Sequence, residues 1–229
     1  MYGYYMDPTY ILVIIGAGIA MYAQHKVTST FAKYSEWETS FGVTGNQVAR
    51  DILSASRIDD VAVEHVQGHL TDHYDPRSKV LRLSDATDYS TSIAAVAVAA
   101  HECGHALQHA QGYAPLRLRS VLAPVTQFGS TISLPLIMIG LAMNFMGLVQ
   151  VGIIAFSLVL VFQLVTLPVE FDASARAMRI LEEQRLLTVE ELPAARKVLN
   201  AAALTYVAAS ISTALQLIRF ILIANRRRD

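Results

Sequence analysis

The sequence predicts a mainly α-helical membrane protein with a small α+β part, and three observations lead to this fold class. Hydrophobic residues make up 53% of the 229 residues and charged residues only 16%, whereas soluble domains carry about 25% charged residues. Residues 120–169 contain no Asp, Glu, Lys or Arg. The region before them combines two short runs of β-type alternation with a helical stretch that carries an H-E-x-x-H motif at residues 101–105.

About four membrane helices are predicted from the apolar stretches. A membrane span needs about 20 apolar residues, so the charge-free stretch can hold two spans with a turn near Gly147. The alternative for this stretch is a buried helical hairpin in a soluble protein. Arg219 lies inside the last apolar stretch, either as a functional residue that faces protein or water or as a side chain that snorkels to the membrane surface. The predicted spans are residues 9–23, 121–145, 148–167 and 201–224.

The positions of the basic residues predict the orientation in the membrane. Lys and Arg concentrate in cytoplasmic loops, and here they occur in segments 24–120 and 169–200 but not among the first 25 residues or in the hairpin turn. We therefore expect a multi-pass protein of the cell membrane with both polar segments in the cytoplasm. Four complete spans would put the basic residues 226–228 on the opposite side, so either the last helix does not cross fully or this tail departs from the rule.

The chain accordingly divides into five predicted segments. They are an N-terminal membrane anchor (1–25), a polar region with the motif helix (26–120), a transmembrane hairpin (121–168), a second polar helical region (169–200) and a C-terminal membrane helix with a basic tail (201–229). The net charge of −1, without a basic stripe, argues against nucleic acid as a partner. The single cysteine, Cys103, excludes an intramolecular disulfide.

The polar region before the motif predicts one helix and a short strand pair. Residues 46–56 have the apolar spacing of an amphipathic helix. Residues 61–66 and 79–83 alternate as strands do, with a turn at 75–78 before the second strand. Two interpretations of these strands are open: an exposed edge that binds an extended peptide, or an ordinary hairpin that covers the motif helix.

The motif helix is expected over residues 90–111. Ser84 or Asp85 can cap its beginning, and Gly112 is a plausible residue for its C-terminal end. Residues four apart share one face of a helix, so the imidazoles of His101 and His105 can bind one metal ion.

A hydrolytic zinc site takes three protein ligands and leaves one position for water, so a third ligand is needed. His109 lies eight residues after His101, which is about 12 Å along a helix and too far for both to bind one ion. Glu170 is favoured because it directly follows the charge-free hairpin. The two spans of the hairpin bring the chain back to the side of the membrane on which the motif helix lies. The small residues Ala173 and Ala177 share its face and permit a close approach. The alternative for Glu170 is an acid that is merely favoured in the first turn of a helix.

Asp172 and Cys103 lie close in sequence to the predicted ligands, but we do not expect either of them to bind the metal. Asp172 is a weak candidate to accept a hydrogen bond from a ligating imidazole, and it can instead pair with Arg176. Cys103 lies between the two histidines, but its side chain should point away from their face. We expect it to be a small buried residue and neither a ligand nor a nucleophile.

Several motifs in a fixed order resemble the YugP-type neutral zinc metallopeptidases, a family of bacterial membrane proteins. The resemblance covers residues 45–219 and rests on LTDHYDPRSKVLRLS, AVAAHECGHALQHA, LPVEFDASARA and AAALTYVAA. It implies a zincin-like catalytic core in residues 26–120 and a glutamate as third ligand, the gluzincin arrangement. The layout is also similar to that of HtpX-type membrane proteases, which place an Asp four residues after this glutamate, where the present chain has Ser174.

The expected function is that of a membrane-anchored zinc endopeptidase that cleaves membrane or misfolded proteins near the cytoplasmic face. Zinc held by His101, His105 and Glu170 would lower the pKa of its water, and Glu102 would act as general base on that water. Tyr206 is the favoured donor to the oxyanion, with a tyrosine at the membrane interface as an equally weighted alternative.

Two other functions are kept open. One is an intramembrane protease of the site-2 type, which the apolar run before His101 favours, although the L-D-G motif of such enzymes does not occur in this sequence. The other is a non-catalytic membrane scaffold that is stabilised by zinc, which would not need Glu102. The expected partners are a peptide or protein substrate and the lipid bilayer, with a membrane-protein regulator or a second copy of the chain left open.

Overall fold

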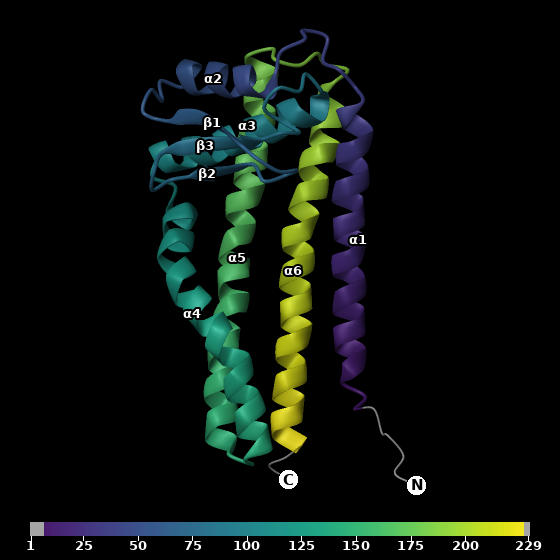
Figure 1. Cartoon of the computed structure of the whole chain (residues 1–229), viewed down its shortest axis with the longest axis vertical. Helices are drawn as coiled ribbons and strands as arrows, with labels where there is room; N and C mark the ends of the chain where they lie inside the picture. Colours follow the sequence, from purple (N-terminus) through teal and green to yellow (C-terminus); the bar gives the residue numbers. More distant parts are fainter. Residues whose placement is uncertain (1–6, 227–229) are drawn as a thin grey trace. The chain divides into compact units, whose positions relative to one another are not determined.

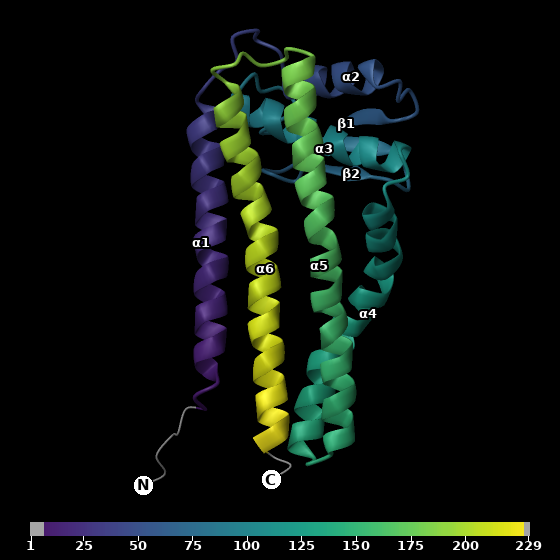
Figure 2. The same ribbon diagram turned by 180° about the vertical axis from the view of Figure 1, so that it is seen from behind.

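Six α-helices and three β-strands form residues 7–226, the part of the chain that this computed structural model describes (Figures 1 and 2). The helices are α1 (Tyr10–Ser35), α2 (Gly45–Ala55), α3 (Ile93–Ala110), α4 (Ala114–Ala142), α5 (Met146–Glu183) and α6 (Leu192–Arg226). The strands are β1 (Ala62–Val66), β2 (His73–Asp75) and β3 (Val80–Ser84). Residues 227 and 228 of the predicted basic tail lie outside the described residues.

The chain divides into two compact units, and long helices contribute to both of them. The helical unit consists of the described residues within Met1–Gln24, Leu118–Leu167 and Thr205–Asp229. The mixed unit consists of His25–Arg117 and Pro168–Leu204, and it contains α2, α3 and all three strands.

As predicted, four helices of the described residues, α1, α4, α5 and α6, are long and apolar enough to cross a bilayer. Within the helical unit, α1 lies beside α6, as both views show (Figures 1 and 2). The Ser212 hydroxyl donates a hydrogen bond of 2.8 Å to the carbonyl oxygen of Gly16. The guanidinium carbon of Arg219 lies 4.3 Å from the centre of the Tyr10 ring. Arg219 is therefore packed against protein, where a cation–π contact stabilises its charge.

The predicted hairpin is formed by α4 and α5, and both helices are longer than the predicted spans. Asn144, with a φ of 53°, lies in the turn between them. A Cβ atom at Gly152 would lie 2.9 Å from the carbonyl oxygen of Ser133, so the glycine lets the two helices approach closely. Ile137 of α4 and Val149 of α5 are buried beside this contact, in a small core that they share with α6.

The predicted strands are present, but they do not pair with each other as a hairpin. The sheet order is β1-β3-β2, with β1 parallel to β3 and β2 antiparallel to β3. The reason is local: the Asp75 carboxylate accepts hydrogen bonds from the backbone of Arg77 and the hydroxyl of Ser78. This turn joins β2 to β3 and leaves β1 to pair on the other side, so β1 and β2 are the two edges.

Side-chain hydroxyls cap the N-terminal ends of α2 and α3. Thr44 accepts a hydrogen bond from the backbone N–H of Gln47 at the start of α2, and Ser92 accepts one from Ala95 at the start of α3. The prediction of a cap at Ser84 or Asp85 is wrong, because Ser84 ends β3.

The core of the mixed unit surrounds the motif helix. One side of α3 packs on α2 and the sheet, through buried residues such as Ile52 and Leu81. The same core includes Leu181 from the C-terminal part of α5 and Val198 from α6. The apolar run Ile93–Ala100 of α3 is therefore buried inside this unit, apart from the partly exposed Val98.

Candidate metal centre

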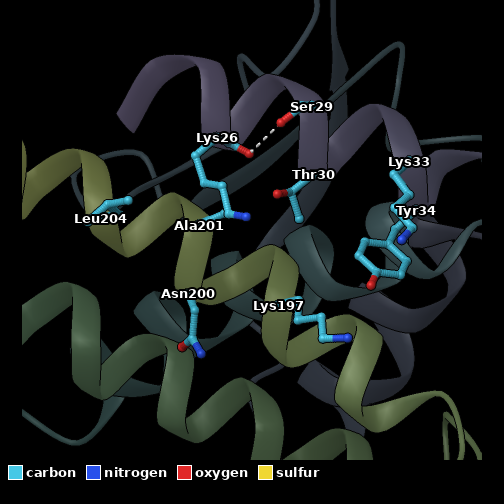
Figure 3. Close-up of a pocket in the computed structure, with 9 residues that line it drawn as sticks. All are labelled: Lys26, Ser29, Thr30, Lys33, Tyr34, Lys197, Asn200, Ala201 and Leu204. Carbon is cyan, nitrogen blue, oxygen red and sulfur yellow. Dashed lines mark hydrogen bonds between the residues drawn. The ribbon is translucent and has the colours of Figure 1, made fainter. Parts of the chain in front are cut away.

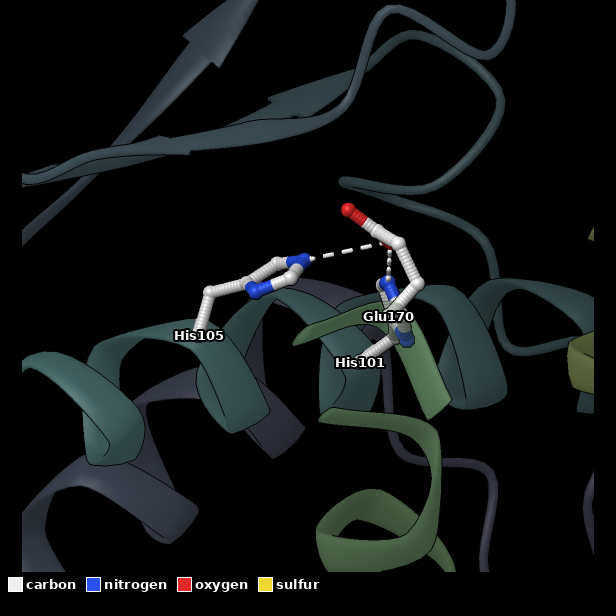
Figure 4. Close-up of side chains that lie close together, drawn as sticks. All are labelled: His101, His105 and Glu170. Carbon is white, nitrogen blue, oxygen red and sulfur yellow. Dashed lines mark hydrogen bonds and ion pairs between the residues drawn. The ribbon is translucent and has the colours of Figure 1, made fainter. Parts of the chain in front are cut away.

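The side chains of His101, His105 and Glu170 meet in the mixed unit. Nε2 of His101 lies 3.3 Å and Nε2 of His105 lies 3.5 Å from the same oxygen, Oε2 of Glu170. Figure 4 shows both imidazoles directed at this carboxylate. The structure thus brings together the two motif histidines on α3 and the predicted third ligand on α5.

This donor set fits a zinc ion. The three ligand atoms lie within 4.8 Å of one another, and two atoms bound at about 2.1 Å to a tetrahedral zinc ion are about 3.4 Å apart. The two imidazole–carboxylate distances match that separation. The side chains are also well shielded from water, with exposed fractions of 14% for His101, 10% for His105 and 2% for Glu170. A buried carboxylate facing two imidazoles is a combination that a divalent cation stabilises.

Close contact between two helix backbones positions the three side chains. A Cβ atom at Gly104 would lie 2.5 Å from the carbonyl oxygen of Ala173, and Ala173 is itself fully buried. The close approach predicted at Ala173 is confirmed, and Gly104 is the residue of α3 that permits it. This crossing holds α3 and α5 at the separation at which Glu170 reaches both histidines.

Gln108, which the sequence did not single out, sets the protonation of His105. Its amide nitrogen donates hydrogen bonds of 2.8 Å to the carbonyl oxygen of Val169 and to Oδ2 of Asp172. The amide oxygen must therefore face Nδ1 of His105, 3.1 Å away, and a neutral imidazole has to donate from that nitrogen. Nε2 then carries the lone pair that a metal requires. The sequence signal that could have identified Gln108 is its position three residues after His105, which places both side chains on the same helix face.

Ser174 occupies the corresponding position beside His101. Its hydroxyl oxygen lies 3.1 Å from Nδ1 of His101. Asp172 reaches the site only indirectly, because it holds Gln108 and also accepts a hydrogen bond of 2.5 Å from Nε of Arg176. The predicted Asp172–Arg176 pair is confirmed, and no direct hydrogen bond joins Asp172 to an imidazole in the described residues.

Glu102 follows His101 on α3 and is 8% exposed. Within residues 7–226 its carboxylate makes no hydrogen bond or ion pair with protein, so its oxygens remain available to another partner. Its charge also acts on the neighbouring ligand. Burial of His105 tends to lower its pKa, but the hydrogen bond to Glu170 and the charges of Glu102 and Glu170 outweigh burial and raise it.

The remaining predicted residues are not part of the cluster that His101, His105 and Glu170 form. Cys103 is buried, and its thiol points at the carbonyl oxygen of Ala49 in α2. A hydrogen bond of 2.7 Å joins Nδ1 of His109 and the hydroxyl of Tyr74. Burial raises the pKa of Tyr74 to about 12. Tyr206 lies on α6 in the helical unit, and its role as oxyanion donor stays a prediction.

Within residues 7–226, four helices able to cross a membrane and a His–His–Glu cluster able to bind a metal ion indicate a membrane-bound metalloprotein. Comparison with known proteins gives the family. Residues 9–225 match the family described as "Putative neutral zinc metallopeptidase", and the chain belongs to this family. Zinc is therefore the metal that the cluster would hold.

A curated relative agrees with this assignment. The chain is 46% identical over 218 residues to the "Putative membrane protease YugP" of Bacillus subtilis (strain 168). The aligned region covers 95% of this chain and 97% of the relative. The expected resemblance to YugP-type peptidases is thus confirmed. No solved structure matches the chain.

Proposed function

We propose that the protein is a membrane-anchored zinc endopeptidase of the gluzincin type, with a zincin-like core in the mixed unit. In this proposal His101, His105 and Glu170 hold the zinc ion. The observation that carries the proposal is the convergence of both imidazoles on one buried carboxylate oxygen, at 3.3 and 3.5 Å, next to Glu102. A purely structural metal site has no use for an adjacent carboxylate without a protein partner.

The chemistry is divided between the metal and the chain. When bound, zinc polarises the peptide carbonyl and makes water acidic enough to attack at neutral pH. Glu102 accepts the proton of the attacking water and passes it to the leaving amine. Gln108 and Ser174 keep the two imidazoles in the orientation and tautomer that metal binding requires. Tyr206 is the proposed hydrogen-bond donor to the oxyanion.

The proposed substrates are membrane or misfolded proteins that present an extended segment. β2 is an edge of the sheet and lies against α3, because the hydroxyl of Tyr74 contacts His109 one turn after His105. An extended peptide can add to such an edge through main-chain hydrogen bonds. The concentration of Lys and Arg in residues 24–120 and 169–200 supports cleavage at the cytoplasmic face.

The buried position of the motif helix favours this function over intramembrane proteolysis. α3 is not among the four helices of the described chain that can cross a membrane, and it packs on α2 and the sheet. The position of the cut distinguishes the two functions. Cleavage in an extended segment outside the bilayer supports the proposal, whereas cleavage within a substrate's transmembrane helix would support a site-2-type enzyme.

The decisive experiment replaces Glu102 in the purified full-length protein. Glu102→Gln should lower the rate of casein or membrane-substrate hydrolysis by about 10²–10⁴-fold while the zinc content stays that of the wild type. Glu183→Gln, at the exposed end of α5, is the matched control and should keep full activity. Retained peptidase activity in Glu102→Gln would rule out the proposed base. A wild-type protein that binds zinc but cleaves none of these substrates would support a scaffold.

A separate variant tests the oxyanion donor. Tyr206→Phe should reduce kcat by about 10²–10³-fold and leave the zinc content unchanged, because only a hydroxyl is lost. Tyr22→Phe is the control, since Tyr22 is 63% exposed on α1. An unchanged kcat in Tyr206→Phe would assign Tyr206 to the membrane interface instead.

A further inference from the structure

Three of the four lysines of the chain line one pocket of the mixed unit. Lys26 and Lys33 extend from α1 and Lys197 from α6, on the walls of a cavity of about 640 Å³. Figure 3 shows Lys26, Lys33 and Thr30 on α1, and Lys197 and Asn200 on the neighbouring α6. Such a concentration is unusual for a chain whose net charge is −1.

The positive charge of this pocket is not neutralised by the protein. The lining contains no Asp or Glu, and none of the three ammonium groups forms an ion pair with a carboxylate in residues 7–226. Lys33 makes cation–π contacts, with its Nζ 5.5 Å from the centre of the Tyr34 ring and 6.0 Å from the centre of the Trp37 ring. Like charges held around one cavity repel each other, so an anion that enters it is stabilised.

The pocket lies where the sequences of α1 and α6 change from apolar to charged residues. Lys26 is the first Lys or Arg of the chain and follows the apolar half of α1. Lys197 is the last charged residue of α6 before a charge-free run that ends at Arg219. Basic residues just beyond a span lie at the depth of lipid headgroups. The wall also has an apolar part, formed by Ala201 and Leu204, which suits the region next to an acyl chain.

We propose that this pocket binds the phosphate headgroup of an anionic phospholipid. Lys26, Lys33 and Lys197 supply the charge, and the hydroxyl of Thr30 and the amide of Asn200 supply hydrogen bonds to phosphate or glycerol oxygens. The site is separate from the candidate metal centre and does not depend on the proposed peptidase activity. Free phosphate has the same chemistry, so the test includes both sources.

The chain has a built-in reporter for this site. Trp37 is its single tryptophan, and the ring lies 6.0 Å from Nζ of Lys33 and packs edge-on against Tyr34. The full-length protein in a neutral detergent is titrated with short-chain phosphatidylglycerol, short-chain phosphatidylcholine, inorganic phosphate or an oligoglutamate peptide. Tryptophan fluorescence is recorded for each. We expect a saturable change with phosphatidylglycerol and none with phosphatidylcholine.

Variants link the signal to the pocket. Each lysine near a headgroup contributes about a fivefold gain in binding, so Lys26→Gln with Lys197→Gln should weaken phosphatidylglycerol binding by roughly 25-fold. Lys33 is left unchanged because it lies at the reporter. Lys79→Gln removes the fourth lysine, which pairs with Asp60 on the surface, and should bind as the wild type does.

Three results would overturn the proposal. The first is equal affinity for phosphatidylcholine and phosphatidylglycerol, and the second is unchanged binding by the double variant. The third is saturation by inorganic phosphate or by oligoglutamate at least as tightly as by phosphatidylglycerol, which would assign the pocket to a soluble anion or an acidic peptide. Zinc content and thermal unfolding of each variant are measured alongside, and wild-type values show that the exposed substitutions leave the fold intact.

Discussion

Gly104 of α3 lies directly against the backbone of Ala173 in α5, where a Cβ atom at residue 104 would be 2.5 Å from the Ala173 carbonyl oxygen. Real Cβ atoms do not approach a backbone oxygen so closely, and neither backbone can turn aside as a flexible side chain would. Gly104 stands between the two histidines in the sequence, and Ala173 stands three residues after Glu170. The contact therefore sets the distance between the two histidines of α3 and Glu170 of α5.

Gly104→Ala should accordingly disrupt the metal centre. Overpacking of a tight contact costs about 1–3 kcal/mol, and the helices must separate, so Glu170 moves away from the imidazoles. We expect a lower midpoint of thermal unfolding in detergent and a substoichiometric zinc content by elemental analysis. Gly18→Ala is the control, because a Cβ atom there would meet no atom within 4 Å and alanine favours helix. Full zinc occupancy in Gly104→Ala would show that the crossing is not what positions the ligands.

Gln108→Leu should weaken zinc binding without removing a ligand. The substitution deletes the acceptor for Nδ1 of His105, and loss of such a partner typically reduces metal affinity by about 10–100-fold. Competition with a chelator of known affinity measures this change in the purified protein. Gln47→Leu, on the exposed face of α2, should keep the wild-type affinity. Identical affinities for Gln108→Leu and the wild type would mean that the amide does not set the state of His105.

Glu191 should make the stability of the mixed unit depend on pH. It accepts a hydrogen bond of 2.8 Å from the backbone of Thr188, and it accepts two more from the backbone and hydroxyl of Ser40. Burial of Glu191 tends to raise its pKa, but these hydrogen bonds outweigh burial and lower it below the usual value of 4.5. A carboxyl with a lowered pKa stabilises the fold above its unfolded-state pKa, and that contribution is lost as the pH falls through the folded-state pKa.

Glu191→Gln should therefore lower stability by about 1–2 kcal/mol at pH 7. The difference from the wild type should shrink as the pH is taken below 4.5, where the wild-type carboxyl begins to be protonated. Thermal or denaturant unfolding at a series of pH values measures both effects. Glu190→Gln, at the exposed neighbouring position, should change little. A difference that stays constant from pH 7 to pH 3 would contradict the proposed role of the charge.

The orientation in the membrane can be tested with cysteine labelling, because the single native thiol is buried. Val189 is 79% exposed in the loop before α6, and Met143 is 71% exposed in the turn between α4 and α5. With the mixed unit in the cytoplasm, a membrane-impermeant maleimide should label Met143→Cys but not Val189→Cys in intact cells. Permeabilised cells should be labelled at both positions. The opposite pattern in intact cells would place the metal centre outside.

The sequence was sufficient for features that depend on local pattern. The apolar stretches predicted four membrane helices, and the alternation of residues 61–66 and 79–83 predicted two strands close to their observed positions. The helical spacing of His101 and His105, and the position of Glu170 directly after the hairpin, singled out the three side chains that the structure brings together. Their role as zinc ligands stays a prediction.

Features that depend on packing between distant segments were not predictable in the same way. β1 pairs in parallel with β3 because the turn after β2 pairs β2 with the other edge of β3. The sequence did not reveal β2 as a strand. Several hydroxyls could have capped α3, and the residue at the start of the helix is Ser92, which forms a β-bridge with the distant Glu38. The hydrogen bonds of Gln108 and Ser174 exist only because α3 and α5 cross at Gly104.

The zinc content of Glu170→Ala tests the central claim most directly. Glu182→Ala on the same helix, exposed near its end, is the matched control for loss of one carboxylate. Both variants and the wild type are purified in the same detergent, and zinc per chain is measured after equilibration with a weak chelator. The three-ligand site predicts about one zinc ion per chain in the wild type and in Glu182→Ala, and loss of most of it in Glu170→Ala. Full zinc occupancy in Glu170→Ala would contradict the assignment of Glu170 as third ligand.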